Sequence, residues 1–301
     1  MQEKARPGVK PVHVLMAIAV PSIWGLGFAV AKVGLGPFPP LFLMGMRYGL
    51  AALVLVWFVR PPFGVMGKVF AAAVISGSIT YGLIFSGLRE IYASTAILVV
   101  QLEVPFLAVL GVVLLKERMG LRNILGMILA FGGVVLIAGE PRVQDNMTPV
   151  LMVIVGGLFW ALGQIMIRRL GSLGSLRLLA WIATFASPQL FIASFFLEHG
   201  QFTALAQAGP REWLVILYLG LIMTALAYGM WYHVLAHCEV NRVAPFLLLN
   251  PVAAVISSVI LLDEELTLMV GLGGLVVILG IAVMTIDPRV WRYRLGKAGT
   301  G

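Results

Sequence analysis

The sequence is poor in charged residues and in cysteine. Only 11% of its 301 residues are charged, whereas a soluble domain carries roughly 25%. Too few polar side chains are therefore present to cover a water-soluble globule. Cys238 is the only cysteine, which excludes an intramolecular disulfide. The sequence also lacks a Walker-type phosphate loop, so it gives no support for ATP-driven transport by this chain.

Long apolar runs make up most of the sequence. The chain is 60% hydrophobic and its mean hydropathy is +1.01. Runs of about 20 apolar residues are long enough to cross the hydrocarbon core of a bilayer. The sequence therefore predicts an all-α polytopic membrane protein with ten transmembrane helices. We expect them at 12–33, 39–59, 69–88, 93–115, 121–139, 149–168, 176–197, 213–235, 243–262 and 267–286.

The basic residues predict the orientation in the membrane. With the N-terminus inside, sixteen of the 21 lysines and arginines fall in inner segments and four in outer ones, while Arg47 lies within a span. Because cytoplasmic loops carry the excess of Lys and Arg, we expect both termini in the cytoplasm. The net charge of +8 lies in short loops between apolar runs, which argues against a nucleic-acid partner.

The chain also repeats itself. IWGLGFAVAK at 23–32 resembles FWALGQIMIR at 159–168, with Trp24 matching Trp160. Further along, Tyr81-Gly82 recurs as Tyr228-Gly229, and the sequence LLKE ending at Glu117 recurs as LLDE ending at Glu264. The sequence therefore predicts two units of five spans, 1–140 and 141–301. Because five is odd, the second unit enters the membrane from the opposite side, and inverted repeats of this kind build secondary transporters.

Two long segments carry a family resemblance. VPFLAVLGVVLLKERMGLRNILGMILAFGGVVLIAG (104–139) and NPVAAVISSVILLDEELTLMVGLGGLVVILGIAVM (250–284) resemble the two EamA domains of the drug/metabolite transporter superfamily. The shared features are a proline within the fourth and ninth helices, a glutamate ending each, and a glycine-rich helix after it. Arg47 matches a common feature of the first helix pair, although Ala183 stands at the aligned position of the second half. The chain is most similar to bacterial aromatic amino acid exporters, which implies a bacterial inner membrane protein.

Prolines within helices predict bends around a central space. A proline leaves the carbonyl four residues earlier without its N–H donor, and in lipid such a carbonyl must find a partner or line a cavity. The alternative is a passive kink satisfied by neighbouring helices. The predicted kinks are at Pro21, Pro105, Pro245 and Pro251, with the carbonyls of Gln101 and Leu247 among those freed.

Aromatic and polar residues in mid-span predict the lining of that space. Trp and Tyr usually favour membrane interfaces, and a buried Trp N–H or Tyr O–H needs a partner, which a polar cavity supplies. Structural packing is the competing interpretation for any single residue. The predicted cavity residues are Trp24, Ser78, Tyr81, Gln101, Glu103, Trp160, Gln164, Tyr228, Tyr232 and Asn250.

Two ionisable residues lie deep in the predicted spans. Arg47 and Glu103 sit at similar depths, and intramembrane charges need a partner or water, so the sequence suggests that they form an ion pair. Asn250 is the repeat partner of Glu103. His13, His199, His233 and His237 are scattered along the chain, so we expect no metal site and no cofactor.

The leading hypothesis is a secondary transporter, not an enzyme, that exports small amphipathic metabolites by alternating access through the central cavity. Aromatic amino acids are the best single substrate. The alternatives are a nucleotide-sugar or phosphorylated-metabolite exchanger, a broad drug or metabolite efflux protein, or a passive channel. Phosphate ligands favour Arg or Lys clamps, and few cations lie near the predicted site.

Overall fold

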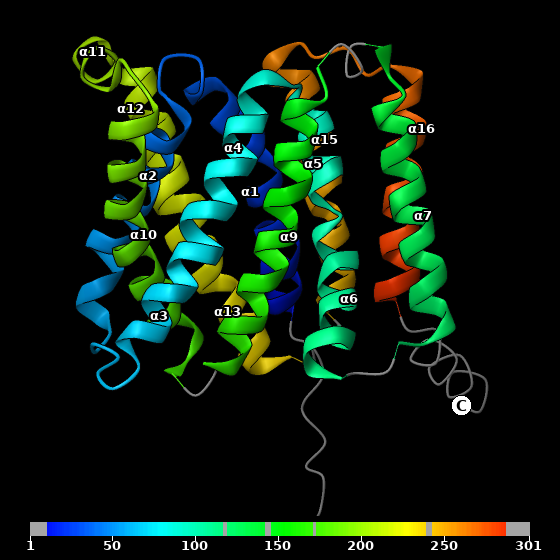
Figure 1. Cartoon of the computed structure of the whole chain (residues 1–301), viewed down its shortest axis with the longest axis horizontal. Helices are drawn as coiled ribbons and strands as arrows, with labels where there is room; N and C mark the ends of the chain where they lie inside the picture. The colour runs from blue at the N-terminus through cyan, green and yellow to red at the C-terminus, as the bar shows by residue number, and fades with distance from the viewer. Residues whose placement is uncertain (1–10, 117–118, 142–145, 171–172, 239–242, 287–301) are drawn as a thin grey trace, which may run out of the picture.

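The apolar runs form ten helical spans, as the sequence predicts (Figure 1). The computed structural model describes residues 11–116, 119–141, 146–170, 173–238 and 243–286. Its spans are, in chain order, α1 (Pro11–Gly34); α2 (Pro40–Leu55) with η1 (Val56–Phe58); α3 (Met66–Ala72), η2 (Ala73–Ile79) and α4 (Thr80–Glu90); α5 (Ala93–Val100) and α6 (Glu103–Leu115); α7 (Leu121–Ala138); α9 (Thr148–Arg169); α10 (Ser175–Leu197); α12 (Pro210–Leu217), η4 (Tyr218–Leu226) and α13 (Ala227–His237); η5 (Ala244–Leu248) and α15 (Leu249–Leu262); and α16 (Leu268–Thr285). A short helix, α11 (Gln201–Gln207), lies between the seventh and eighth spans.

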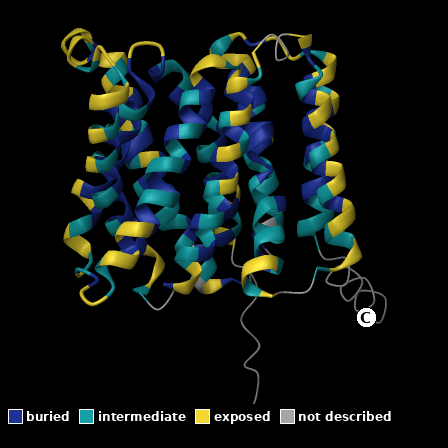
Figure 2. Cartoon of the chain, in the orientation of Figure 1, coloured by how far each residue is buried: buried dark blue, intermediate teal, exposed yellow. Residues whose placement is uncertain are grey.

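Large apolar side chains cover the outside of the bundle. Trp57 is 80% exposed, Phe196 74% and Val135 70%. Figure 2 shows exposed residues along the outward faces of the peripheral helices and buried ones between the helices. In water this surface would favour aggregation, whereas in a bilayer it faces acyl chains. The chain is an integral membrane protein.

The helix contacts repeat with the inverted symmetry that the sequence predicts. α1 packs against α13, and its counterpart α9 packs against α4. The second span contacts the seventh through α2 and α10, and the fifth contacts the tenth through α7 and α16. A local detail agrees, because Lys116 and Asp263, which are equivalent, both end their helices with positive φ, 57° and 51°. The division of the chain at residue 140 stays a prediction.

Glycines bring α7 and α16 into backbone contact. A Cβ on Gly133 would lie 2.6 Å from the Gly273 carbonyl oxygen, and one on Gly273 would lie 2.7 Å from the Gly133 oxygen. Gly126 and Gly280 meet in the same reciprocal way at 2.6 Å. Each pair maps onto the other under the repeat, so this seam lies on the pseudo-twofold axis. Small residues let membrane helices approach closely enough for such packing.

Gly133→Ala is expected to destabilise the protein, because no side chain of alanine size fits against the Gly273 backbone. Overpacking of this kind costs about 1–3 kcal/mol. Gly132→Ala is the matched control on the same helix, since nothing lies within 4 Å of its added Cβ. The melting temperatures of the two purified variants check this. Equal temperatures would show that the seam relaxes freely.

The four predicted proline kinks have different outcomes. Pro105 follows a break between α5 and α6, and Pro251 follows the junction of η5 and α15. In contrast, α1 is continuous through Pro21. Pro245 lies in the first turn of η5, where no intrahelical N–H is needed, so the prediction of a mid-helix kink there is wrong.

The carbonyls expected to be freed by proline have partners. The Gln101 carbonyl accepts the Val104 N–H at 3.2 Å, and the Leu247 carbonyl accepts the Leu249 N–H. The bond from Val104 is of the 3₁₀ type and restores a donor that the proline ring cannot supply. The Leu249 N–H is shared between the carbonyls of Leu247 and Phe246. The expectation that these carbonyls are free is therefore wrong.

The third and eighth spans each contain a π-helical segment that the sequence analysis missed. The segments are η2 and η4, which occupy matching positions of the repeat just before Tyr81 and Tyr228. At both segments a threonine hydroxyl donates to the carbonyl five residues earlier. Thr80, directly after η2, donates to Ile75 at 2.8 Å, and Thr224, within η4, donates to Leu219 at 2.7 Å. Such segments often occur at functional sites.

Charged side chains hold the end of the bundle at which α1 finishes, which is the upper end in Figure 1. The buried Glu264 carboxylate accepts the N–H groups of Ala93 and Ser94 at 2.6 and 3.0 Å and the Ser94 hydroxyl at 2.6 Å, capping α5. Lys32 Nζ donates to three carbonyls at the end of α4, at 2.7–2.8 Å. A negative cap at a helix start and a cation at a helix end both suit the helix dipole. Glu117, the repeat partner of Glu264, lies outside the described residues.

Candidate functional site

Two adjoining cavities lie in the interior of the bundle. The larger has a volume of about 500 Å³ and the smaller about 340 Å³. Six residues line both: Arg47, Tyr81, Trp160, Gln164, Tyr228 and Tyr232. Other lining residues, among them Arg168 and Ser175 in the smaller cavity and Leu235 and Thr285 in the larger, belong to the lower ends of their helices. Both cavities therefore extend towards the end where α1 begins.

Towards the opposite, upper end, buried apolar side chains pack between the first four spans. These come from the loop after the first span and from the facing ends of the second, third and fourth spans, and each is at most 2% exposed: Leu35, Phe38, Leu43, Leu88 and Ile97. Together with the Lys32 and Glu264 contacts, they separate the cavities from the upper face.

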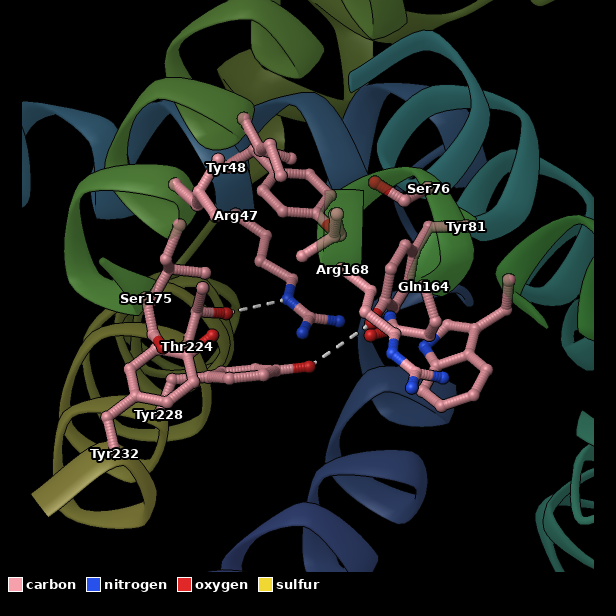
Figure 3. Close-up of a pocket in the computed structure, with 15 residues that line it drawn as sticks. Arg47, Tyr48, Ser76, Tyr81, Gln164, Arg168, Ser175, Thr224, Tyr228 and Tyr232 are labelled. Atoms are coloured by element: carbon pink, nitrogen blue, oxygen red, sulfur yellow. Dashed lines mark hydrogen bonds between the residues drawn. The ribbon is translucent and has the colours of Figure 1, made fainter. Parts of the chain in front are cut away.

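Arg47 is the buried cation of the site. It is 1% exposed, and α2 places it against the π-helical η4, where its Nε donates to Thr224 Oγ1 at 2.9 Å. Its Nη1 faces only the Met44 sulfur, at 3.9 Å. Figure 3 shows the guanidinium pointing into the pocket, with its outer nitrogens beyond the Thr224 bond. Among the described residues, no carboxylate pairs with it.

Aromatic rings surround that guanidinium. Its carbon lies 5.0 Å from the centre of the Tyr81 ring, 5.6 Å from Tyr48 and 5.8 Å from Phe85. Cation–π contacts of this kind stabilise a charge away from water while leaving N–H groups unused. This arrangement leaves N–H groups of Arg47 that can donate to an anionic group in the cavity.

The equivalent tyrosines of the two repeats meet at the site. The Tyr81 and Tyr228 hydroxyls are 3.5 Å apart (Figure 3), and because the repeat exchanges the two residues, the pair lies on the pseudo-twofold axis. Both line both cavities, so the pair forms part of the wall between them. The aromatic wall continues from Tyr228 to Trp24, whose ring centres are 4.9 Å apart, and the Trp24 N–H reaches the Met223 carbonyl at 3.1 Å.

Acceptors line the larger cavity. Glu103 begins α6 just after the helix break, and Asn250, its repeat partner, lies at the matching position of α15. The Asn250 Oδ1 is buried and accepts no hydrogen bond from the described residues. Gln101 lines the same cavity. Two repeat-equivalent acceptors thus face a space that also holds Arg47.

The suggested ion pair between Arg47 and Glu103 is not formed. Both residues line the larger cavity, but Arg47 donates to Thr224 instead. The two residues lie at similar depths in the membrane but are not neighbours, because the helices that carry them are not adjacent. The cavity therefore holds a guanidinium and a carboxyl group that are not hydrogen-bonded to each other.

Nine of the ten predicted cavity residues line the two cavities, and Ser78 does not. Ser78 is hydrogen-bonded to Gln189 on α10 at 2.6 Å, because the π-helical turn in η2 alters which face precedes Tyr81. The sequence analysis missed Tyr48, Phe85, Thr224 and Trp231. Tyr48 and Phe85 lie near Arg47 and Tyr81 in the chain, which is a weak indication that they line a cavity. Nothing in the sequence indicates the same for Thr224.

The comparison with known families agrees with this architecture. A model of the EamA-like transporter family matches residues 12–139 and again 147–286. The chain belongs to the EamA-like transporter family. This EamA-like protein is thus a transporter of the membrane rather than an enzyme, and a small molecule is the kind of substrate that its family implies.

Full-length relatives share the same organisation. A "Probable amino-acid metabolite efflux pump" of Escherichia coli K12 is 31% identical, over 92% of this chain and 96% of the relative. A protein of the same name from Salmonella typhimurium LT2 is 30% identical with the same coverage. A crystal structure of an 18% identical protein superimposes with a TM-score of 0.63 over 92% of this chain and 97% of the other, which shows the fold alone.

Proposed function

We propose that this EamA-like transporter exports amino acids and related amphipathic metabolites, with aromatic amino acids as preferred substrates. The observation that carries the proposal is the buried Arg47, which faces a cavity and has no carboxylate partner among the described residues. An arginine fork binds a carboxylate through two parallel hydrogen bonds. The substrate carboxylate therefore lies against Arg47, between Thr224 and the tyrosines.

The other groups of the cavity suit the rest of an α-amino acid. Glu103 and the unpaired Asn250 oxygen accept hydrogen bonds from the substrate ammonium. Trp24, Trp160 and Tyr228 offer flat apolar walls to its side chain, and aromatic pairing contributes about 0.5–1.5 kcal/mol beyond area burial. The names of the Escherichia coli and Salmonella relatives, amino-acid metabolite efflux pumps, support this class of substrate.

The proposal includes alternating access. The two cavities extend towards the lower end, while buried apolar side chains pack between the first four spans towards the upper end. In an inverted repeat, exchange of the two halves' shapes reverses this asymmetry. The structure then corresponds to the state that loads substrate from the lower side, which the charge bias of the loops assigns to the cytoplasm of a bacterial cell.

Thiol labelling tests this orientation. Cys238 is only 4% exposed, so Cys238→Ser provides a silent background. Phe63 and Phe202 are both 78% exposed, on the turn before α3 and on α11, at opposite ends of the bundle. A membrane-impermeant reagent applied to intact cells is expected to label Phe202→Cys and not Phe63→Cys. The reverse pattern would contradict the orientation.

Counterflow in proteoliposomes tests the substrate class. Preloaded phenylalanine is expected to accelerate uptake of labelled phenylalanine. Phenethylamine, which lacks the carboxylate, and phenylpropionate, which lacks the ammonium, should each compete poorly, because each leaves one end of the cavity unpaired. Acceleration by a nucleotide-sugar but by no amino acid would overturn the proposal. Uptake without acceleration would indicate a passive channel.

A further inference from the structure

Three histidines from two different spans meet at the lower end of the bundle. His13 lies in the first turn of α1, and His233 and His237 lie one turn apart on α13. The ring centres of His13 and His237 are 5.4 Å apart, those of His13 and His233 5.7 Å, and those of His233 and His237 4.3 Å. One ring nitrogen of each histidine lies within 4.8 Å of the other two. We expected no metal site because these histidines are far apart in the sequence, but the fold brings three of them together.

We propose that His13, His233 and His237 bind one divalent transition-metal ion of the zinc, cobalt, nickel or copper group. Three imidazoles with a fourth position left for water form a known type of zinc coordination. A ligand set made only of imidazole nitrogen suits these metals and not Mg²⁺ or Ca²⁺, which favour oxygen. No acidic residue belongs to the cluster in the described part of the chain.

The tautomer of one histidine already fits a metal ligand. His237 Nδ1 lies 2.8 Å from the carbonyl oxygen of His233. A carbonyl only accepts, so Nδ1 carries the hydrogen and Nε2 of the neutral ring keeps its lone pair. Metal-bound histidines commonly donate their second ring nitrogen to a backbone carbonyl in this way, which fixes the ring and raises its basicity.

The spacing requires a small adjustment that the site allows. With metal–nitrogen bonds of about 2.1 Å, ligand nitrogens in a tetrahedral site are about 3.4 Å apart, compared with the 4.8 Å limit in the empty cluster. His13 is buried, which makes it the fixed member, while His233 and His237 are exposed. We expect rotation of the exposed His233 ring, with a small shift of His237 that keeps its bond to the His233 carbonyl, to close this gap.

A metal ion here would tie together two spans that line the larger cavity. α1 contributes Trp24 to that cavity, and α13 contributes Tyr232 and Leu235, which stand on either side of His233 in the sequence. The two spans belong to different repeats. Because alternating access requires the repeats to move against each other, the bound ion restrains the lower end and slows transport.

Cobalt and zinc titrations of the purified full chain test the site. The titrations require protein that is free of a polyhistidine tag and has first been treated with a chelator to remove bound metal. Co²⁺ is expected to give the visible absorption of a tetrahedral centre with about one ion per chain, and Zn²⁺ is expected to displace it. Loss of an outer-shell partner weakens metal binding by about 10- to 100-fold. His237→Gln removes a direct ligand and should therefore weaken cobalt binding by more than this. His13→Gln should do the same.

Two control variants identify the ligands. His199→Gln changes an exposed histidine outside the cluster and is expected to bind cobalt as the wild type does. Cys238→Ser removes the only thiol and should also leave the spectrum unchanged. Loss of binding in either control, or undiminished binding in His237→Gln, would overturn the three-histidine site. The three-histidine site would also be overturned if cobalt showed no saturable binding and the melting temperature of the protein depended on pH but not on zinc.

Discussion

Arg47→Gln is expected to reduce phenylalanine counterflow by about 10- to 100-fold at subsaturating substrate. The substitution removes the charge-assisted hydrogen bond that we propose between Arg47 and the substrate carboxylate. Such bonds contribute about 1.5–3 kcal/mol, and each 1.4 kcal/mol equals a factor of ten in affinity. The guanidinium is buried and caged by Tyr48, Tyr81 and Phe85, so water does not replace the lost interaction. Counterflow rates, normalised to the amount of folded protein in the liposomes, check this result.

Two comparisons separate substrate binding from a structural role of Arg47. Arg47→Lys keeps the charge but loses the planar fork, so its transport rate should lie between those of wild type and Arg47→Gln. Arg89→Gln changes an exposed arginine at the upper end and should transport normally. Phenethylamine has no carboxylate, so its residual transport should be the same with or without Arg47. If Arg47→Gln lowered phenethylamine transport as much as phenylalanine transport, Arg47 would be part of the scaffold.

Glu264→Gln is expected to lower the free energy of unfolding by about 3 kcal/mol. The buried carboxylate accepts two backbone N–H groups and a hydroxyl at the start of α5. A glutamine keeps the shape but turns one acceptor oxygen into an NH₂ that faces donors. Leaving a buried donor unsatisfied costs about 1–3 kcal/mol, more where a charge is involved. Denaturant or thermal unfolding of the purified variant measures the loss.

Glu265→Gln is the matched control, because it changes the neighbouring carboxylate, which is exposed. It is expected to unfold within about 1 kcal/mol of wild type, because the interactions of an exposed carboxylate contribute little to stability. Equal losses in both variants would mean that the local negative charge, and not the cap on α5, stabilises this end. A stable Glu264→Gln protein with slow transport would place Glu264 in gating instead.

Much of the fold could be predicted from the sequence because lipid imposes simple constraints. Each span needs about 20 apolar residues in a helix, and the helices lie within a few residues of their expected ends. The inverted repeat was visible from single matches such as Tyr81 with Tyr228. Residues near these matches, including Trp160 and Gln164, line the cavities as expected.

The parts that escaped prediction depend on how distant segments meet. The π-helical turns have no local sequence signature, and they place Thr224 beside Arg47 and turn Ser78 towards Gln189. The supposed pairing of Arg47 with Glu103 assumed that residues at equal depth are neighbours. His13 and His237 come together only because α1 of one repeat packs against α13 of the other.

The repeat is symmetric in its backbone but not in its charges. Arg47 has Ala183 as its counterpart, and Glu103 has Asn250, so both ionisable groups of the larger cavity belong to the first half of the chain. A carrier made of two identical halves would present equivalent surfaces, related by the twofold axis, to its substrate in its two states. In the function proposed above, the substrate carboxylate therefore stays against Arg47 of the first half in both states of the cycle.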